Sequence, residues 1–401
     1  MILLKNCSLF DPNALGNRDI LIGGGRVVCI APQIDTPDLP GLEVLDVEAR
    51  WVIPGLVDSH IHFAGAGGEG GPVTRTSPIP LDAIIEAGIT TVVGCLGTDG
   101  ITRGVESVLM EAKALRQAGL SAWIYTGSYQ IPPPTITGDV ARDLALISEV
   151  IGVGEIALAD HRSSDPSEGE LLRLARRTHL GALLGNKKGI INIHLGDQPD
   201  PFGILQRVAQ RDGVGHYRFL PTHCNRSRSV LAEAAVWGRE GYVDLTASSY
   251  PYYADLEIKP STAVQELLDQ GVPFHHITIS SDAGGSLPQF DEHGTLVKNA
   301  LGHPASLLRE VLDFSESAKS TNFSPFALAT AHPADILGLS RKGRIRVGND
   351  ADLAILRHDR QEIHALMAGG RWLSPPPGYS GNQNRLEKQF PNEPKGTHHK
   401  K

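Results

Sequence analysis

Short apolar runs rich in β-branched residues recur along the middle of the chain, and stretches with helical spacing of apolar positions separate them. The runs lie at 51–62, 90–96, 121–129, 154–160, 191–197, 217–223, 242–248 and 276–282. Several are apolar at consecutive positions, which is typical of strands buried on both faces. Helical spacing is seen at 102–119, 139–152, 169–178 and 230–241. This alternation predicts an α/β fold, a (β/α)₈ TIM-like barrel over residues 51–340.

Both ends of the chain have a different pattern, with short β-like runs separated by turns. Three such runs lie within residues 1–50, and another follows the barrel at 342–357. We therefore expect residues 1–50 and 341–373 to form a small β-sandwich domain built from both chain ends. Residues 374–401 are rich in proline and polar residues, so they are predicted to be a disordered tail.

Composition and charge narrow the class of protein. Of 401 residues, 41% are hydrophobic and 20% are charged, which is typical of a soluble globular protein. The formal net charge of −8 disfavours nucleic acid and anionic membranes as partners. The four cysteines form no CxxC pair, so neither a disulfide framework nor a zinc ribbon is expected. The first residues contain no signal-peptide core and no apolar run approaches membrane length, which predicts a cytoplasmic protein.

Histidines and acids stand at the C-terminal ends of the predicted strands. In chain order they are His60, His62, Glu155, His194, His223 and Asp282. Barrel strands direct their C-terminal ends to one face, so these side chains should meet there. His60 and His62 are two positions apart, and both therefore point to the same side of an extended strand. Imidazole and carboxylate groups are zinc ligands, and the six together predict a site for two Zn²⁺ ions.

Such a site predicts hydrolytic chemistry. Two zinc ions that share a water molecule would lower its pKa towards ~7 and make hydroxide available at neutral pH. Asp282 could bind metal, take the proton as hydroxide attacks, and return it to a leaving amine. An HxH pair alone also occurs among structural histidines, so the prediction depends on the joint placement of all six residues.

Several motifs resemble those of one known family. "PGLVDSHIH", "SSDAGGS" and "GNDADLAIL" are similar to motifs of the amidohydrolase superfamily. Within it, "GGEGGPVTRT", "GTDG", "TGSYQIPPPTITG", "ADHRSS", "LPTHCNR" and "SSDAGGSLPQFDE" resemble the isoaspartyl dipeptidase family, in the same order. The resemblance extends over about residues 15 to 360. The resemblance implies a binuclear zinc peptidase whose small-molecule substrates are β-aspartyl dipeptides. It also implies assembly as a homo-oligomer, an octamer.

One position departs from that family. The family commonly bridges its metals with a lysine carbamate placed seven residues before the arginine of a DHR motif, and here Glu155 stands there. A glutamate presents the same carboxylate on a shorter arm, so its strand must approach the metals more closely. Gly154 would give the backbone room for this approach. The alternative is that Glu155 points elsewhere and that only one metal is held.

The glycine-rich segment after the first strand is interpreted as a substrate cradle. "GAGGEG" formally matches a dinucleotide-binding motif, but prolines follow where that motif needs a helix. The resemblance implies that Glu69 pairs with the α-ammonium group of the aspartyl residue. It also assigns the α-carboxylate to Gly67, Thr98 and Ser286, the carboxylate of the second residue to Arg162 and Arg226, and the oxyanion to Tyr129. Asp160 and His161 are candidates for supporting positions.

Alternatives stay open for these assignments. Tyr129 could simply be packed, Thr98 could cap a helix, and either arginine could form a structural ion pair. A cyclic-amide hydrolase of the same superfamily, of hydantoinase or dihydroorotase type, would use a similar metal centre, but its substrates lack a free α-amine. A non-catalytic scaffold would be expected to have lost metal ligands, and all six positions are filled.

Overall fold

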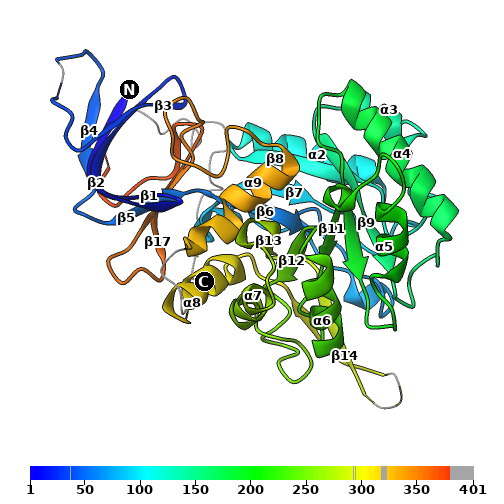
Figure 1. The fold of residues 1–401 in the computed structure, drawn as a ribbon. Coiled ribbons are helices and arrows are strands. Elements are labelled where there is room, and N and C mark those ends of the chain that lie inside the picture. The colour runs from blue at the N-terminus through cyan, green and yellow to red at the C-terminus, as the bar shows by residue number, and fades with distance from the viewer. Residues whose placement is uncertain (37, 292, 294, 318–322, 380–401) are drawn as a thin grey trace, which may run out of the picture.

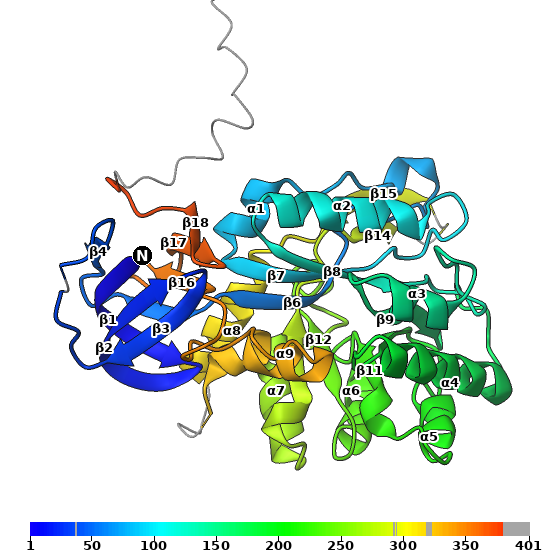
Figure 2. The same cartoon turned by 90° about the horizontal axis from the view of Figure 1, so that it is seen from above.

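The structure, a computed structural model, describes residues 1–379 except 37, 292, 294 and 318–322 (Figure 1). A sheet formed by strands within residues 2–54 and 353–374 lies beside a larger α/β part (Figures 1 and 2). Most of the predicted tail, from residue 380 onwards, lies outside the described residues. None of the helices in the described part of the chain is both long and apolar enough to cross a membrane.

Strands from both ends of the chain form one mixed eight-stranded sheet. Its order is β18-β17-β16-β5-β1-β2-β3, and β4 pairs with β1. The strands are β1 (Ile2–Asp11), β2 (Asn13–Gly23), β3 (Arg26–Ala31), β4 (Glu43–Asp46), β5 (Trp51–Pro54), β16 (Leu353–Leu356), β17 (Ile363–Ala368) and β18 (Arg371–Ser374). Both ends of the chain therefore contribute to one sheet, and the two-layered sandwich stays a prediction.

The run at 51–62, expected to be a single barrel strand, is divided at Gly55. Before it, β5 pairs with β1 and β16; after it, β6 (Leu56–Ile61) pairs with β7. The Gly55 N–H donates to Asp352 O at 2.9 Å, and a Cβ at Gly55 would lie 2.3 Å from the side chain of Thr90. The chain thus passes from one sheet to the other at a point where only glycine fits.

The larger part contains a curled parallel sheet of six strands in the order β11-β10-β9-β8-β7-β6. The strands that follow β6 are β7 (Ile89–Gly94), β8 (Ser121–Thr126), β9 (Val150–Leu158), β10 (Ile190–Leu195) and β11 (Phe219–Thr222). Every residue of β6, β7, β9, β10 and β11 is buried. Burial on both faces explains why these runs lack strict alternation of apolar and polar positions.

Two more strands, β12 (Val243–Thr246) and β13 (Ile277–Ser280), form a separate parallel pair. Backbone hydrogen bonds connect this pair to the six-stranded sheet beyond the strand ends. Asp282 N donates to His60 O at 2.9 Å, and Cys224 N donates to Asp244 O at 3.1 Å. The six-stranded half barrel is observed, whereas a continuous eight-stranded barrel ladder stays a prediction.

Helices lie around the outside of the sheet (Figure 2). They are α1 (Leu81–Glu86), α2 (Val105–Gln117), α3 (Val140–Leu146), α4 (Glu168–Leu184), α5 (Gly203–Ala209), α6 (Arg228–Trp237), α7 (Pro260–Asp269), α8 (Ser306–Ser317) and α9 (Ala331–Leu337). Short 3₁₀ helices occur at η1 (Pro72–Thr74), η2 (His216–Arg218), η3 (Phe274–His276) and η4 (Pro325–Ala329). A hairpin of β14 (Ser286–Phe290) and β15 (Leu296–Leu301) follows β13.

The helix expected over 139–152 is wrong in its second half, because α3 ends at Leu146 and β9 begins at Val150. The ammonium group of Lys187 explains the early end. It donates to the carbonyl oxygens of Leu144, Ile147 and Val150 at 2.6 to 2.7 Å. These carbonyls converge on one cation, an arrangement that a continuing helix does not provide.

Candidate active site

The C-terminal ends of the parallel strands open into a cavity of about 490 Å³. Nearly all of the predicted site residues line it, namely His62, Gly67, Glu69, Thr98, Tyr129, Glu155, Arg162, His194, His223, Arg226, Asp282 and Ser286. His60 is fully buried behind this lining, beside Glu155 and Asp282. The structure therefore brings together every residue that the sequence singled out, although their roles stay predictions.

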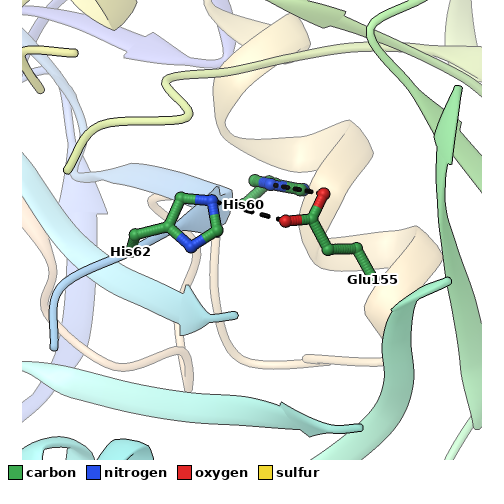
Figure 3. Close-up of side chains that lie close together, drawn as sticks. All are labelled: His60, His62 and Glu155. Carbon is green, nitrogen blue, oxygen red and sulfur yellow. Dashed lines mark ion pairs between the residues drawn. The ribbon is translucent and has the colours of Figure 1, made fainter. Parts of the chain in front are cut away.

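The first group of candidate ligands comes from β6, β9 and the segment after β13. His60 and His62 point toward the carboxylate of Glu155 (Figure 3), each with Nε2 at 3.5 Å from one of its oxygens. Asp282 Oδ1 lies 3.5 Å from His60 Nε2 and 3.1 Å from His62 Nε2. Ligand atoms about 2.0–2.1 Å from a tetrahedral zinc ion are about 3.3 Å apart, so these separations fit one ion.

The second group shares Glu155. Its Oε2 lies 3.1 Å from His194 Nδ1 and 3.7 Å from His223 Nε2, and these two nitrogens are 2.9 Å apart. Glu155 thus points into the cluster, with Oε1 toward His62 and Oε2 toward the other three histidines. A carboxylate in this position can contact two ions at once. A Cβ at Gly154 would lie 2.6 Å from Asn192 O, so a glycine is required for this approach of β9 to β10.

The other ring nitrogens of three histidines are held by neighbouring groups, which leaves Nε2 of each ring for a ligand. The pairs are His60 Nδ1 with Asn192 Oδ1 at 3.1 Å, His62 Nδ1 with Cys95 O at 3.2 Å, and His223 Nδ1 with Thr246 Oγ1 at 2.6 Å. His60 Nε2 is buried and forms no hydrogen bond within the described residues. A buried nitrogen without a partner is costly, so this donor set fits a divalent metal ion.

The charge states of Glu155, Asp282 and His223 also suit metal ligands, whereas the neighbouring acids raise the pKa of His62. Burial favours the neutral form of Glu155, but the imidazoles, His60 first, hold the pKa of this carboxyl well below its usual value. Burial alone would raise the pKa of Asp282, but the neighbouring imidazoles of His60 and His62 lower it. Burial, together with the neighbouring His194, lowers the pKa of His223 to about 3. Ionised carboxylates and neutral imidazoles are the forms that bind metal.

Asp160 connects His194 to Arg162. It accepts hydrogen bonds from Arg162 Nε and Nη2 at 2.8 and 2.7 Å, and its Oδ2 lies 3.1 Å from His194 Nε2. The Tyr129 hydroxyl lies 2.9 Å from His194 Nδ1, and burial raises the pKa of this hydroxyl well above the usual value. Arg162 is therefore already paired by a carboxylate, while its guanidinium still lines the cavity. The adjacent His161 also lines the cavity but is exposed.

The glycine-rich loop after β6 carries an unsatisfied charge. Ser286 Oγ donates to Glu69 Oε1, whereas Glu69 Oε2 is buried and has no hydrogen-bond partner among the described residues. Gly67 has a φ of +76°, and a Cβ there would lie 2.2 Å from Thr74 O and 3.0 Å from Ser286 Cβ. Glycine at this position lets the loop pack against Ser286. The free carboxylate oxygen can then accept from a cation bound in the cavity.

Arg226 is a cation on the same cavity wall without an acidic partner. No ion pair joins its guanidinium to any residue in the described part of the chain, and its Nε is buried without a hydrogen-bond partner. Arg226 can therefore bind an anion in the cavity, in contrast to the paired Arg162.

Sequence reasoning missed a group of residues in the cavity wall. They are Asp197, Ser249, Tyr253 and Glu257. The last three lie in segment 249–257 after β12, which contains turns and no recognisable motif. The one available signal was position, because loops that follow barrel strands line the functional face.

Comparisons with known proteins show what the chain is similar to. A model of the amidohydrolase family matches residues 192–373. The structure of a β-aspartyl dipeptidase from Fervidobacterium islandicum AW-1, in complex with β-Asp-Leu dipeptide, is 36% identical with a TM-score of 0.86, and the match covers 93% of this chain and 96% of that chain. A dihydroorotase from Lactiplantibacillus plantarum is 23% identical over 90% of both chains.

One further curated relative matches only locally. Dihydropyrimidinase 2 from Caenorhabditis briggsae is 44% identical over 62 residues, which are 16% of this chain and 12% of that protein. This match therefore concerns a short segment and not the whole relative.

Proposed function

We propose, since this chain belongs to the amidohydrolase superfamily and is a metal-dependent hydrolase, that it hydrolyses β-aspartyl (isoaspartyl) dipeptides. The observation that carries the proposal is Glu69 Oε2, a buried carboxylate oxygen that has no hydrogen-bond partner among the described residues and lies in the cavity with the candidate metal ligands. The likeness to a β-aspartyl dipeptidase over nearly the full chain supports it.

Two zinc ions would complete the centre. His60, His62 and Asp282 would hold one ion, His194 and His223 would hold the other, and Glu155 would contact both. When bound, these ions would lower the pKa of a water molecule and polarise the amide carbonyl of the substrate.

The side chains around the ions would then move protons and stabilise charge. Asp282 is ionised, so its carboxylate would accept the proton of the attacking water and pass it to the departing amine. The Tyr129 hydroxyl, kept protonated by its raised pKa, would donate to the carbonyl oxygen as negative charge develops there. A donor of this kind contributes about 3 kcal/mol to transition-state stabilisation. The two hydrogen bonds from Arg162 to Asp160 would hold the Arg162 guanidinium beside Tyr129.

Recognition of the β-linkage would depend on the α-carbon of the aspartyl residue, which carries a free ammonium and a free carboxylate only when the linkage is through the side chain. Glu69 would bind the ammonium. Gly67, Thr98 and Ser286 would bind the α-carboxylate. Arg162 and Arg226 would bind the carboxylate of the second residue, a task suited to guanidinium groups.

The test sets purified protein against β-Asp-Leu, α-Asp-Leu, dihydroorotate and hydantoin, with and without a chelator. We expect release of leucine from β-Asp-Leu alone, loss of this activity on chelation, and its recovery on addition of zinc. Hydrolysis of the cyclic amides without cleavage of β-Asp-Leu would refute the proposal in favour of a cyclic-amide hydrolase. Cleavage of both dipeptides would show that Glu69 does not recognise the linkage.

Assembly as a homo-oligomer in the cytoplasm belongs to the same proposal and is supported by the family resemblance. Light scattering on purified protein would give the mass of the assembly in multiples of the 43.0 kDa chain. An eightfold mass supports an octamer, and a mass of one chain contradicts any assembly.

A further inference from the structure

The segment after β12 places in the cavity an acid that the proposed reaction does not use. Glu257 lines the cavity, and Ser249 Oγ donates to its Oε2 at 2.6 Å. Within the described residues, the Glu257 carboxylate forms no ion pair with a lysine or an arginine. A carboxylate in a partly buried wall with one neutral donor retains the capacity to bind a cation.

Glu257 lies close enough to Arg226 on the same wall for the Arg226 charge to lower its pKa, and Arg226 has no ion pair among the described residues. The residues next to them in the chain are joined by two hydrogen bonds, from Ile258 N to Asn225 O at 2.8 Å and from Asn225 Nδ2 to Ile258 O at 3.0 Å. Arg226 follows β11 and Glu257 follows β12, so two neighbouring loops present one positive and one negative group to the cavity.

Segment 249–257 is also fixed to the opposite hairpin. The Tyr253 hydroxyl donates to Pro288 O at 2.9 Å, and Gln289 Nε2 donates to Tyr252 O at 3.1 Å. These contacts join the segment to β14, whose first residue, Ser286, is bonded to Glu69. Hydrogen bonds to the loop after β11 on one side and to β14 on the other thus set the position of Glu257 relative to the proposed binding site.

In the proposed function the aspartyl half of the substrate is bound at Glu69, and the carboxylate of the second residue is bound at Arg226. The side chain of that second residue then extends from the carbon next to the carboxylate held by Arg226, and Glu257 is the acid beside this point. A cationic side chain would meet a carboxylate there, an aliphatic one would leave this carboxylate without a cationic partner, and an acidic one would be repelled.

We propose that Glu257 selects dipeptides whose second residue has a cationic side chain, so that the preferred substrates are β-Asp-Lys and β-Asp-Arg. This proposal rests on the proposed function and names its substrate class. The charged groups that face Glu257 are Arg226 after β11 and Asp282 after β13, and on its own segment it faces the Ser249 and Tyr253 hydroxyls.

The test measures kcat/KM of the zinc-loaded protein for β-Asp-Lys, β-Asp-Arg, β-Asp-Leu and β-Asp-Glu. We expect both cationic dipeptides to exceed β-Asp-Leu by about tenfold or more, since a charged hydrogen bond is at stake, and β-Asp-Glu to be the poorest. Glu257→Gln should remove most of the preference for β-Asp-Lys over β-Asp-Leu. Asp255→Asn is the matched control, because it removes the same charge from an exposed position of the same segment and should preserve the preference.

Each other outcome overturns the proposal. Equal kcat/KM for β-Asp-Lys and β-Asp-Leu in the unmodified protein contradicts it directly. An equal loss on both substrates in Glu257→Gln would show that Glu257 only supports Arg226. Loss of the preference in Asp197→Asn instead would assign it to that exposed acid at the cavity rim. Cleavage of β-Asp-Leu without any preference refutes the selection alone, whereas cleavage of none of the four refutes the proposed function as well.

Discussion

Replacement of Glu69 by glutamine tests the recognition of the α-ammonium group in isolation. The substitution retains the size of the side chain and an oxygen that can accept from Ser286, but it removes the charge. Glu69 is the only acid between Asp58 and Asp82, so no neighbouring residue of the loop can take over. The buried Oε2 would become an amide nitrogen that faces the ammonium with its own hydrogen atoms.

The expected loss follows from this geometry. Glu69 Oε2 has no hydrogen-bond partner among the described residues, so its hydrogen bond to the substrate would not compete with an existing contact there. A hydrogen bond to a charged group contributes about 1.5–3 kcal/mol. The kcat/KM for β-Asp-Leu should therefore fall by about 10- to 150-fold.

The assay compares β-Asp-Leu with N-succinyl-leucine, which is the same molecule without the α-amino group. Unmodified protein should strongly prefer β-Asp-Leu, and Glu69→Gln should lower kcat/KM for β-Asp-Leu while N-succinyl-leucine changes little. This double comparison isolates the contact between Glu69 and the ammonium from general effects on the loop. An equal loss on both substrates would falsify the assignment, because the change would then act through the loop alone.

Three other predictions address the metal, the pH dependence and the fold. Glu155→Gln should lower the bound zinc, measured by mass spectrometry of the ashed protein, from two ions per chain to one or none; two retained ions would contradict a shared ligand. Burial raises the pKa of Glu257 to about 7 against the charge of Arg226. The carboxylate forms as pH rises, so the ratio of kcat/KM for β-Asp-Lys to that for β-Asp-Leu should increase between about pH 6 and about pH 8, and a flat ratio would oppose this. Lys187→Met leaves three carbonyls without their shared donor and should cost about 2 kcal/mol of unfolding free energy, measured by urea denaturation, whereas the exposed Lys188→Met should cost little.

The metal-ligand cluster could be predicted from the sequence because its geometry follows from strand direction. Parallel strands bring their C-terminal ends to one edge, so a histidine or an acid at that position needs no further information to be placed. His60 lies in β6 at one edge of the six-stranded sheet, and His194 and His223 lie in β10 and directly after β11 at the other edge, yet the curl of the sheet brings all three together. Gly154 could likewise be predicted. The side chain of Glu155 is shorter than the lysine carbamate of the similar family, so its strand must come closer and needs a glycine there.

Contacts made by side chains across long distances could not be predicted. The end of α3 depends on Lys187, which comes from a different element and leaves no mark in the apolar pattern of residues 139–152. The pairing of Arg162 with Asp160 depends on side-chain conformations, although both residues stood in a recognised motif. Glu257 was missed because its segment has neither periodicity nor a motif, and only the closed cavity shows which of its side chains point inward.

The passage of the chain at Gly55 has a consequence for how the protein is made. β5 pairs with β16, and the N–H of Gly55 donates to Asp352 O. Gly55 lies only five positions before His60. Synthesis proceeds from the N-terminus, so residues 352–356 leave the ribosome long after His60 and His62. The start of the segment that carries His60 and His62, two candidate metal ligands, can therefore be fixed in this way only after residues 352–356 have been made. The candidate ligands from this segment can therefore reach their final positions only after the segment that follows the barrel has been synthesised.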